Sequence, residues 1–216
     1  MKKSKLPQAR AALFLIVFFV SALFTSTHAA YLSLGESGEV IPESTFQVGA
    51  APQVITNGDG GFNVAAFLDA GWTDSFSSRF MLGAGEVDFY VSGSAKWIPF
   101  PDVDRQPAMG LKLSLWYARE GSSNINTIQL LPMVSKKYPT DNGIFIPYAA
   151  YGISNYSIAG SNKTGDQFFI GSDWKNPDFG SINVTGEIAT SLKDSTSSIS
   201  IFASIPFDNK KGFGSK

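Results

Sequence analysis

The sequence predicts an all-β protein, an antiparallel, up-and-down barrel of about ten strands, with about eight as the lower limit. Apolar and polar residues alternate in segments of about ten residues, as expected for strands with two different faces. Glycine, asparagine, aspartate, serine and proline separate these segments. After residue 30 no sustained spacing of three and four predicts amphipathic helices. Closure into a barrel removes the exposed strand edges, and a two-sheet sandwich is the other way to protect them.

The first 30 residues predict a cleaved export signal. Four basic residues and no acidic residue lie in the first ten positions, and an apolar run follows from Ala11 to Phe24. Small and polar residues then lead to Ala29 and Ala30, where we expect cleavage. The apolar run is shorter than the about 20 residues that a spanning helix needs. Residues 1–30 are therefore left out of the fold prediction.

Removal of this segment changes the chemistry that the chain can offer. The single histidine, His28, lies within it, and the chain has no cysteine. The predicted mature chain therefore lacks histidine-dependent triads, histidine or cysteine zinc sites and histidine general bases. It is also acidic, without clusters of arginine and lysine, which argues against nucleic-acid binding. We expect no catalytic residue, no cofactor and no metal site.

Strand alternation is clearest in residues 61–72. One face of this segment carries Phe62, Val64 and Leu68, and the other carries Asn63 and Asp69. Similar patterns predict further strands. The clear ones are 87–97, 109–117, 182–192 and 198–207, and the weaker ones are 45–55, 79–85, 125–136, 144–156 and 167–174.

The strand count depends on a glycine-rich break at 83–86. Without a turn there, residues 79–98 would form one strand and 31–39 would supply the tenth. In an up-and-down barrel the connections alternate between two ends. One end is predicted to carry 56–60, 85–86, 120–124, 157–166 and 193–196, and the other 73–78, 99–107, 137–142 and 176–180.

Charge distinguishes the two faces of the predicted strands. A lipocalin-like soluble barrel turns its apolar faces inward, whereas a membrane barrel turns them outward to lipid. The apolar faces here are almost free of charge. The opposite faces carry Asp69, Asp88, Lys96, Lys112 and Glu187 among glycine, serine and asparagine. We expect these five residues to face a narrow lumen and to neutralise one another, because unpaired buried charges are costly.

Aromatic residues lie near the ends of the predicted strands. Trp72, Trp97, Tyr117 and Phe207 are predicted to form the aromatic girdles of a membrane barrel. Strands of about 10 to 12 residues match a tilted membrane crossing, whereas strands of globular proteins average about 5 to 6 residues. Both features favour a transmembrane barrel over a soluble one.

The last predicted strand, 197–207, alternates apolar residues and ends on Phe207. It resembles the C-terminal signal that small outer-membrane β-barrels of Gram-negative bacteria present to their assembly machinery. Residues 208–216 depart from that pattern, because they continue past the aromatic residue as a polar tail. The resemblance covers residues 31–207 and implies a barrel domain in the outer membrane. It also implies lipid and the assembly machinery as partners.

Outer-membrane barrels that are enzymes resemble one another in relying on a catalytic histidine, which the predicted mature chain lacks. We therefore expect a non-enzymatic structural or envelope component, or a narrow pore for small solutes. Its lumen should be largely filled by side chains, because barrels of about eight strands are filled and open channels appear near about sixteen. The alternative is a soluble periplasmic, lipocalin-like barrel that binds an apolar ligand.

Overall fold

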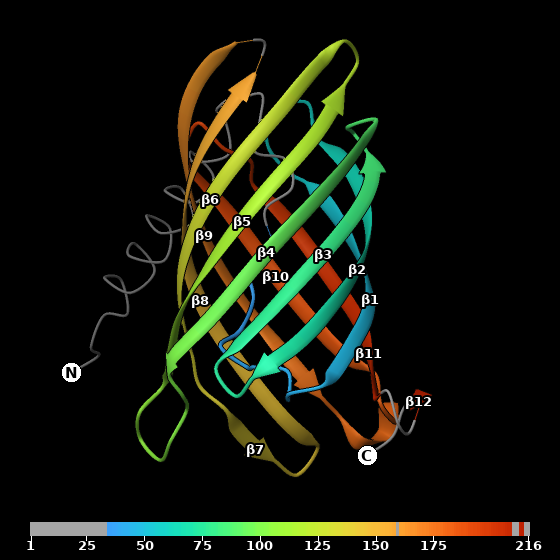
Figure 1. The fold of residues 1–216 in the computed structure, drawn as a ribbon, viewed down its shortest axis with the longest axis vertical. Helices are drawn as coiled ribbons and strands as arrows, with labels where there is room; N and C mark the ends of the chain where they lie inside the picture. The colour runs from blue at the N-terminus through green and yellow to red at the C-terminus, as the bar shows by residue number, and fades with distance from the viewer. Residues whose placement is uncertain (1–33, 159, 209–211, 214–216) are drawn as a thin grey trace, which may run out of the picture.

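The structure, a computed structural model, describes residues 34–158, 160–208 and 212–213 (Figure 1). The predicted export signal, 1–30, lies outside these residues, as does most of the predicted tail. The described chain forms an all-β, antiparallel, closed barrel with ten strands in its wall. The predicted fold class is therefore confirmed, with a strand number at the upper limit of the prediction.

Ten long strands of 10 to 16 residues build the barrel wall. They are β1 (Thr45–Ile55), β2 (Gly61–Thr73), β3 (Phe76–Gly85), β4 (Phe89–Phe100), β5 (Ala108–Glu120), β6 (Ser123–Ser135), β8 (Gly143–Ile158), β9 (Ser161–Lys175), β10 (Asn183–Lys193) and β11 (Ser198–Asp208). Three short elements lie outside the wall: β7 (Tyr138–Thr140), β12 (Gly212–Phe213) and the 3-10 helix η1 (Pro177–Phe179).

Each wall strand pairs with its neighbour in the chain, and β1 pairs with β11 to close the barrel. The closing register places Val48 opposite Ile205 on one side, and Val48 faces Leu68 of β2 on the other. The short strand β7 pairs with β8, and β12 pairs with β11 where the sequence predicts a polar tail. Every long strand therefore has two paired edges, which satisfies its backbone polar groups.

The connections alternate between the two ends of the barrel, as predicted. We call the end where β1 begins and β11 finishes the terminal end, and the other the loop end (Figure 1). Residues 86–88 separate β3 from β4, so 79–98 do not form one strand. Residues 34–39 form no strand, so the alternative tenth strand at 31–39 is wrong in its described part. The pairing of β1 with β11 already closes the barrel, so no further strand is needed at 34–39.

Side chains alternate between an apolar outside and a largely polar inside. Large apolar residues point outward from all ten wall strands, and Leu115, Ile188 and Ile201 are 55–58% exposed. Among the described outward positions of the wall, charge is confined to Arg119, Asp166 and Lys193, all near the loop end. The buried polar residues instead occupy the inward positions.

Two apolar clusters share the interior with these polar groups. One lies toward the loop end and includes Leu34, Trp116, Tyr156 and Phe202. The other includes Leu131 and further buried side chains, which are Ile98, Ala108, Met133, Ala150, Phe169 and Ala189. The lumen is therefore occupied by packed side chains as well as by charges.

Candidate lumenal site

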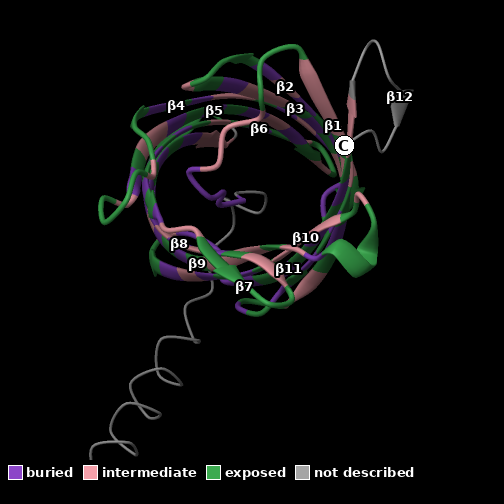
Figure 2. Cartoon of the chain, turned by 90° about the horizontal axis from the view of Figure 1, so that it is seen from below, coloured by how far each residue is buried: buried purple, intermediate pink, exposed green. Residues whose placement is uncertain are grey.

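Residues 34–44, which we call the lumenal segment, run from inside the barrel to its terminal end, where residues 42–44 are exposed and the chain enters β1 (Figure 2). Leu34 packs in the apolar cluster toward the loop end. At the terminal end Ser44 adopts a left-handed conformation with φ 61°, and its N–H donates to the Gly71 carbonyl at 3.2 Å. A Cβ at position 71 would lie 2.2 Å from the Pro42 carbonyl oxygen. Glycine at this position of β2 therefore lets the segment lie against the wall.

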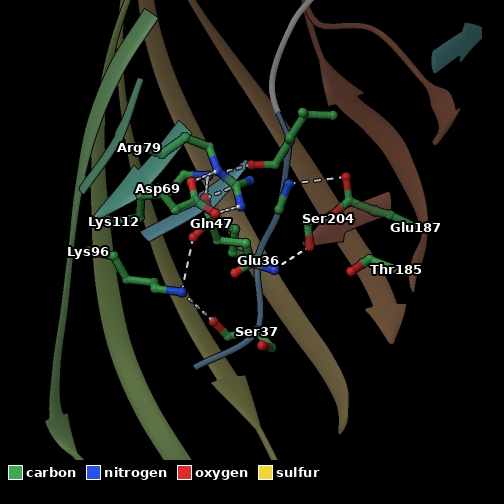
Figure 3. A network of polar contacts seen from close by, with 12 residues as sticks. Glu36, Ser37, Gln47, Asp69, Arg79, Lys96, Lys112, Thr185, Glu187 and Ser204 are labelled. Carbon is green, nitrogen blue, oxygen red and sulfur yellow. Dashed lines mark hydrogen bonds and ion pairs between the residues drawn. The ribbon is translucent and has the colours of Figure 1, made fainter. Parts of the chain in front are cut away.

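The carboxylate of Glu36 is the centre of the lumenal charge network (Figure 3). Its Oε1 lies 3.0 Å from Arg79 Nη1 and 3.1 Å from Lys112 Nζ, and its Oε2 lies 3.1 Å from Lys96 Nζ. All four side chains are at most 12% exposed. We call Arg79, Lys96 and Lys112 the basic triad. One carboxylate thus binds three cations where screening by water is weak.

Strand register explains why these cations meet. Lys96 of β4 is the direct cross-strand partner of Lys112 of β5. Asp69 of β2 is the direct partner of Arg79 of β3, and the two form a forked pair with distances of 2.6 and 2.8 Å. Like charges opposite one another destabilise a sheet, so the lysine pair needs a counter-ion from elsewhere. Glu36 supplies it.

The other side of the lumen presents carboxylates to the same segment. Glu187 of β10 accepts hydrogen bonds from the Gly35 N–H at 3.0 Å and from the Tyr148 hydroxyl at 2.6 Å. Asp173 of β9 accepts one from the Ser37 hydroxyl. A Cβ at position 35 would lie 2.2 Å from Glu187 Oε2, so glycine permits this close approach. The segment therefore donates to the acidic side of the lumen.

The backbone carbonyls of the segment are bound by the two lysines. Lys112 Nζ donates to the Leu34 carbonyl at 2.7 Å. Lys96 Nζ donates to the carbonyls of Ser37 and Glu39 at 3.2 and 2.8 Å. The lysines thus hold the backbone as well as the carboxylate, which satisfies their donors inside the barrel.

A second ion-pair group holds the segment near the terminal end. The Glu39 carboxylate lies 2.9 Å from Lys137 Nζ and 3.1 Å from Lys175 Nζ. Burial alone would raise the pKa of Glu39, but Lys175 and Lys137 hold it below its ordinary value. Glu39 is therefore charged at neutral pH and fixes the outer part of the segment.

A cavity of about 400 Å³ lies beside the lumenal segment. Glu36, Arg79 and Lys96 border it inside the barrel, and Lys175 and Asn183 border it at the terminal end. This volume lies in the range of about 300–1,000 Å³ that is typical of small-molecule sites. The arrangement can hold a small polar solute next to two members of the basic triad.

Four of the five residues predicted for the lumenal charge network lie in the barrel interior. Asp69, Lys96, Lys112 and Glu187 are each at most 7% exposed. The prediction is wrong for Asp88, which is exposed in the turn between β3 and β4 and accepts a hydrogen bond from the Gly121 N–H at 2.9 Å. The alternation of inward and outward side chains in β4 does not continue into this turn. Extending it to Asp88 therefore predicted the wrong face.

The sequence pattern did not indicate six charged residues of the site, which are Glu36, Glu39, Arg79, Lys137, Asp173 and Lys175. Arg79 stands at the first position of a predicted strand, and the register that places it opposite Asp69 comes from the structure. Asp173 shares the inward positions of β9 with Gln167 and Phe169. Glu36 carried no signal, because its segment has no alternation.

The predicted aromatic residues lie near both ends of the barrel. Trp72 and Trp97 are 56% and 53% exposed near the terminal end. Phe207 stacks on Phe46 at the same end, with ring centroids 5.4 Å apart. Tyr117 lies toward the loop end, 5.8 Å from Phe89. Aromatic side chains are therefore present near both ends of the barrel.

The chain matches no protein-family model and no curated protein. Among the described residues no helix is long and apolar enough to cross a membrane. In the same part of the chain no group of three or more acidic, histidine or cysteine residues is arranged to hold a metal ion. The site is thus characterised by its ion pairs and its cavity.

Proposed function

We propose that this chain is an integral β-barrel of a Gram-negative outer membrane, a non-enzymatic envelope component whose lumen is closed by its own lumenal segment. The observation that carries the proposal is the inversion of the two faces of the wall. Apolar side chains cover the outside and charged groups lie inside. Lipid hydrocarbon favours this distribution, because every wall strand is paired and the middle of the outward face carries apolar side chains.

The extent of the apolar outside supports lipid rather than water as its surroundings. Leu115, Ile128 and Ile188, from three different strands, are each 55–56% exposed, and many similar residues surround the wall. Soluble monomers rarely expose continuous apolar patches of more than about 300–600 Å². A lipocalin-like barrel would place such side chains inside, around its ligand.

Strand length and aromatic placement give independent support. The wall strands have 10 to 16 residues, enough for a tilted crossing that takes about 9–11. Trp72 and Trp97 at the terminal end, with Phe89 and Tyr117 toward the loop end, lie where the two membrane interfaces would be.

The contents of the lumen favour a closed barrel over an open pore. The apolar clusters, the basic triad and the lumenal segment occupy the interior together. Conduction of small solutes would therefore require the lumenal segment to move. A structural or envelope role follows most directly from a lumen that is closed in this way.

Export and assembly belong to the same proposal. The predicted signal at 1–30 would direct secretion, with the terminal end of the barrel facing the periplasm. The last wall strand, β11, would present its alternating apolar face and Phe207 to the assembly machinery. Lipid is then the main partner of the mature barrel.

Thiol labelling in broken membranes tests the proposal, since the chain has no cysteine. Leu113→Cys places a thiol on the outward face of β5, and Ser122→Cys places one in the exposed β5–β6 turn as the control. We expect a lipid-soluble maleimide to label both variants and a charged thiol reagent to label only Ser122→Cys. Labelling of Leu113→Cys by the charged reagent, with the protein in the periplasmic extract, would instead show that the outward face lies in water and would contradict the proposal.

A further inference from the structure

The basic triad gathers three cations at one place in the lumen, and Asp173 and Glu187 act on them electrostatically from beyond ion-pair distance. Its three cationic side chains face two carboxylates, Glu36 and Asp69, within ion-pair distance. A phosphate group offers more charge and more acceptor oxygens than one carboxylate. Arginine and lysine side chains at such a cluster are well suited to bind it.

The carboxylate bound by the basic triad belongs to a part of the chain that can leave the lumen without disrupting strand pairing in the wall. Glu36 lies in the lumenal segment, which forms no strand, and strand pairing starts only at Thr45. The segment is held by hydrogen bonds and ion pairs with the lumen, including those of Gly35, Ser37 and Glu39. Its release would leave all ten wall strands paired.

The cavity gives a solute a route to the triad. It runs from Lys175 and Asn183 at the terminal end to Glu36, Arg79 and Lys96 inside the barrel. A small anion in this cavity would lie beside the Glu36 carboxylate and could contact the same cations. Exchange therefore needs no opening between wall strands.

We propose that Arg79, Lys96 and Lys112 form an oxyanion site whose resident ligand is the Glu36 carboxylate. A phosphate-bearing solute that enters from the terminal end exchanges with Glu36 and releases the lumenal segment from the triad. The site depends on the lumen alone, so it goes beyond the proposed membrane function and can be tested separately from it.

Calorimetric titration with inorganic phosphate tests the exchange on the purified full barrel, in chloride buffers of constant ionic strength. Glu36→Gln removes the internal competitor, so we expect phosphate to bind this variant about tenfold or more tightly than the wild type. Asp88→Asn makes the same charge change in the exposed turn between β3 and β4, outside the cavity and the lumenal segment, and it should bind like the wild type. Equal phosphate affinity in Glu36→Gln and the wild type would overturn the proposal.

A second substitution shows whether the triad is the site. Adding Lys96→Met to Glu36→Gln should abolish the tight binding, because it removes a triad cation that borders the cavity. Retention of tight binding by this double variant would place phosphate elsewhere and overturn the assignment.

Release of the segment can be followed without altering Glu36 or the triad. Ser37→Cys places a thiol at a position that is 3% exposed. At constant ionic strength we expect phosphate to raise its labelling rate by a charged reagent about tenfold over chloride. Ser122→Cys should react at the same rate in both anions. An unchanged rate for Ser37→Cys would contradict the exchange even if Glu36→Gln did not fold.

Discussion

Lys96 and Lys112 face each other directly across β4 and β5, and their ammonium groups bind opposite oxygens of the Glu36 carboxylate at 3.1 Å each. Two lysines in this register repel each other unless a counter-ion lies between them. That counter-ion comes from outside the wall strands. The wall and the lumenal segment are therefore interdependent, because the charges of one are compensated by the other.

Loss of the central carboxylate should weaken the barrel more than loss of the outer one. Glu36→Gln leaves buried cations without their counter-ion, a change that typically costs about 3–5 kcal/mol. Glu39→Gln, whose partners Lys137 and Lys175 are 40% and 33% exposed, should cost about 0–1 kcal/mol. Urea unfolding of the barrel in lipid vesicles measures both. Equal free energies of unfolding would contradict a central role for Glu36.

Acid should loosen the contacts at the terminal end. Burial would raise the pKa of Glu39 and Asp102, but lysines hold both below their ordinary values of 4.5 and 3.8. The unfolded chain then takes up these protons at higher pH than the folded chain. The stabilisation is complete above pH 4.5 and is lost as pH falls through the folded pKa values.

The pH dependence of urea unfolding measures this effect. The double variant Glu39→Gln, Asp102→Asn should lose less stability between neutral pH and acid than the wild type. If both proteins showed the same acid dependence, the two carboxylates would not be responsible.

A charge on the outward face distinguishes lipid from water. Ile188→Lys places a lysine on the apolar outside of β10, where the native side chain is 55% exposed. In a bilayer it should cost about 2–4 kcal/mol near the midplane, whereas an exposed position in water should change stability by about 0.5 kcal/mol or less. Asn126→Lys, outward near the loop end, is the control and should cost about 0–1 kcal/mol.

Planar bilayer recordings test the closed lumen. The wild-type barrel should show no large, stable openings, because side chains and the lumenal segment fill its interior. Deletion of residues 34–40 removes Leu34 and Glu36 together and should produce discrete conductance. Large openings in the wild type would contradict a closed resting state.

Alternation predicted most of the wall, because the two faces of its strands differ in polarity. The bounds of β1 agree with the predicted 45–55, and the outward face of β2 carries Phe62 and Leu68 as expected. The prediction for β9, 167–174, was too short, since residues 161–166 are polar on both faces and offer no contrast. Strand register then placed Asp69 opposite Arg79, which alternation alone does not specify.

The lumenal segment was not predictable in the same way. Its position depends on tertiary contacts from several strands, such as Glu187 to Gly35 and Lys96 to Glu36. A local pattern carries no information on which strands will surround it. The predicted domain 31–207 therefore combines a wall that begins at Thr45 with a segment that fills it.

The most direct measurement is the gel mobility in SDS of the native protein from a purified outer-membrane fraction, before and after boiling. A closed barrel in lipid resists SDS until it is boiled, because no strand edge is exposed. We expect recovery in that fraction and a mobility shift on boiling. A single mobility, with the protein in the periplasmic extract, would contradict the membrane barrel.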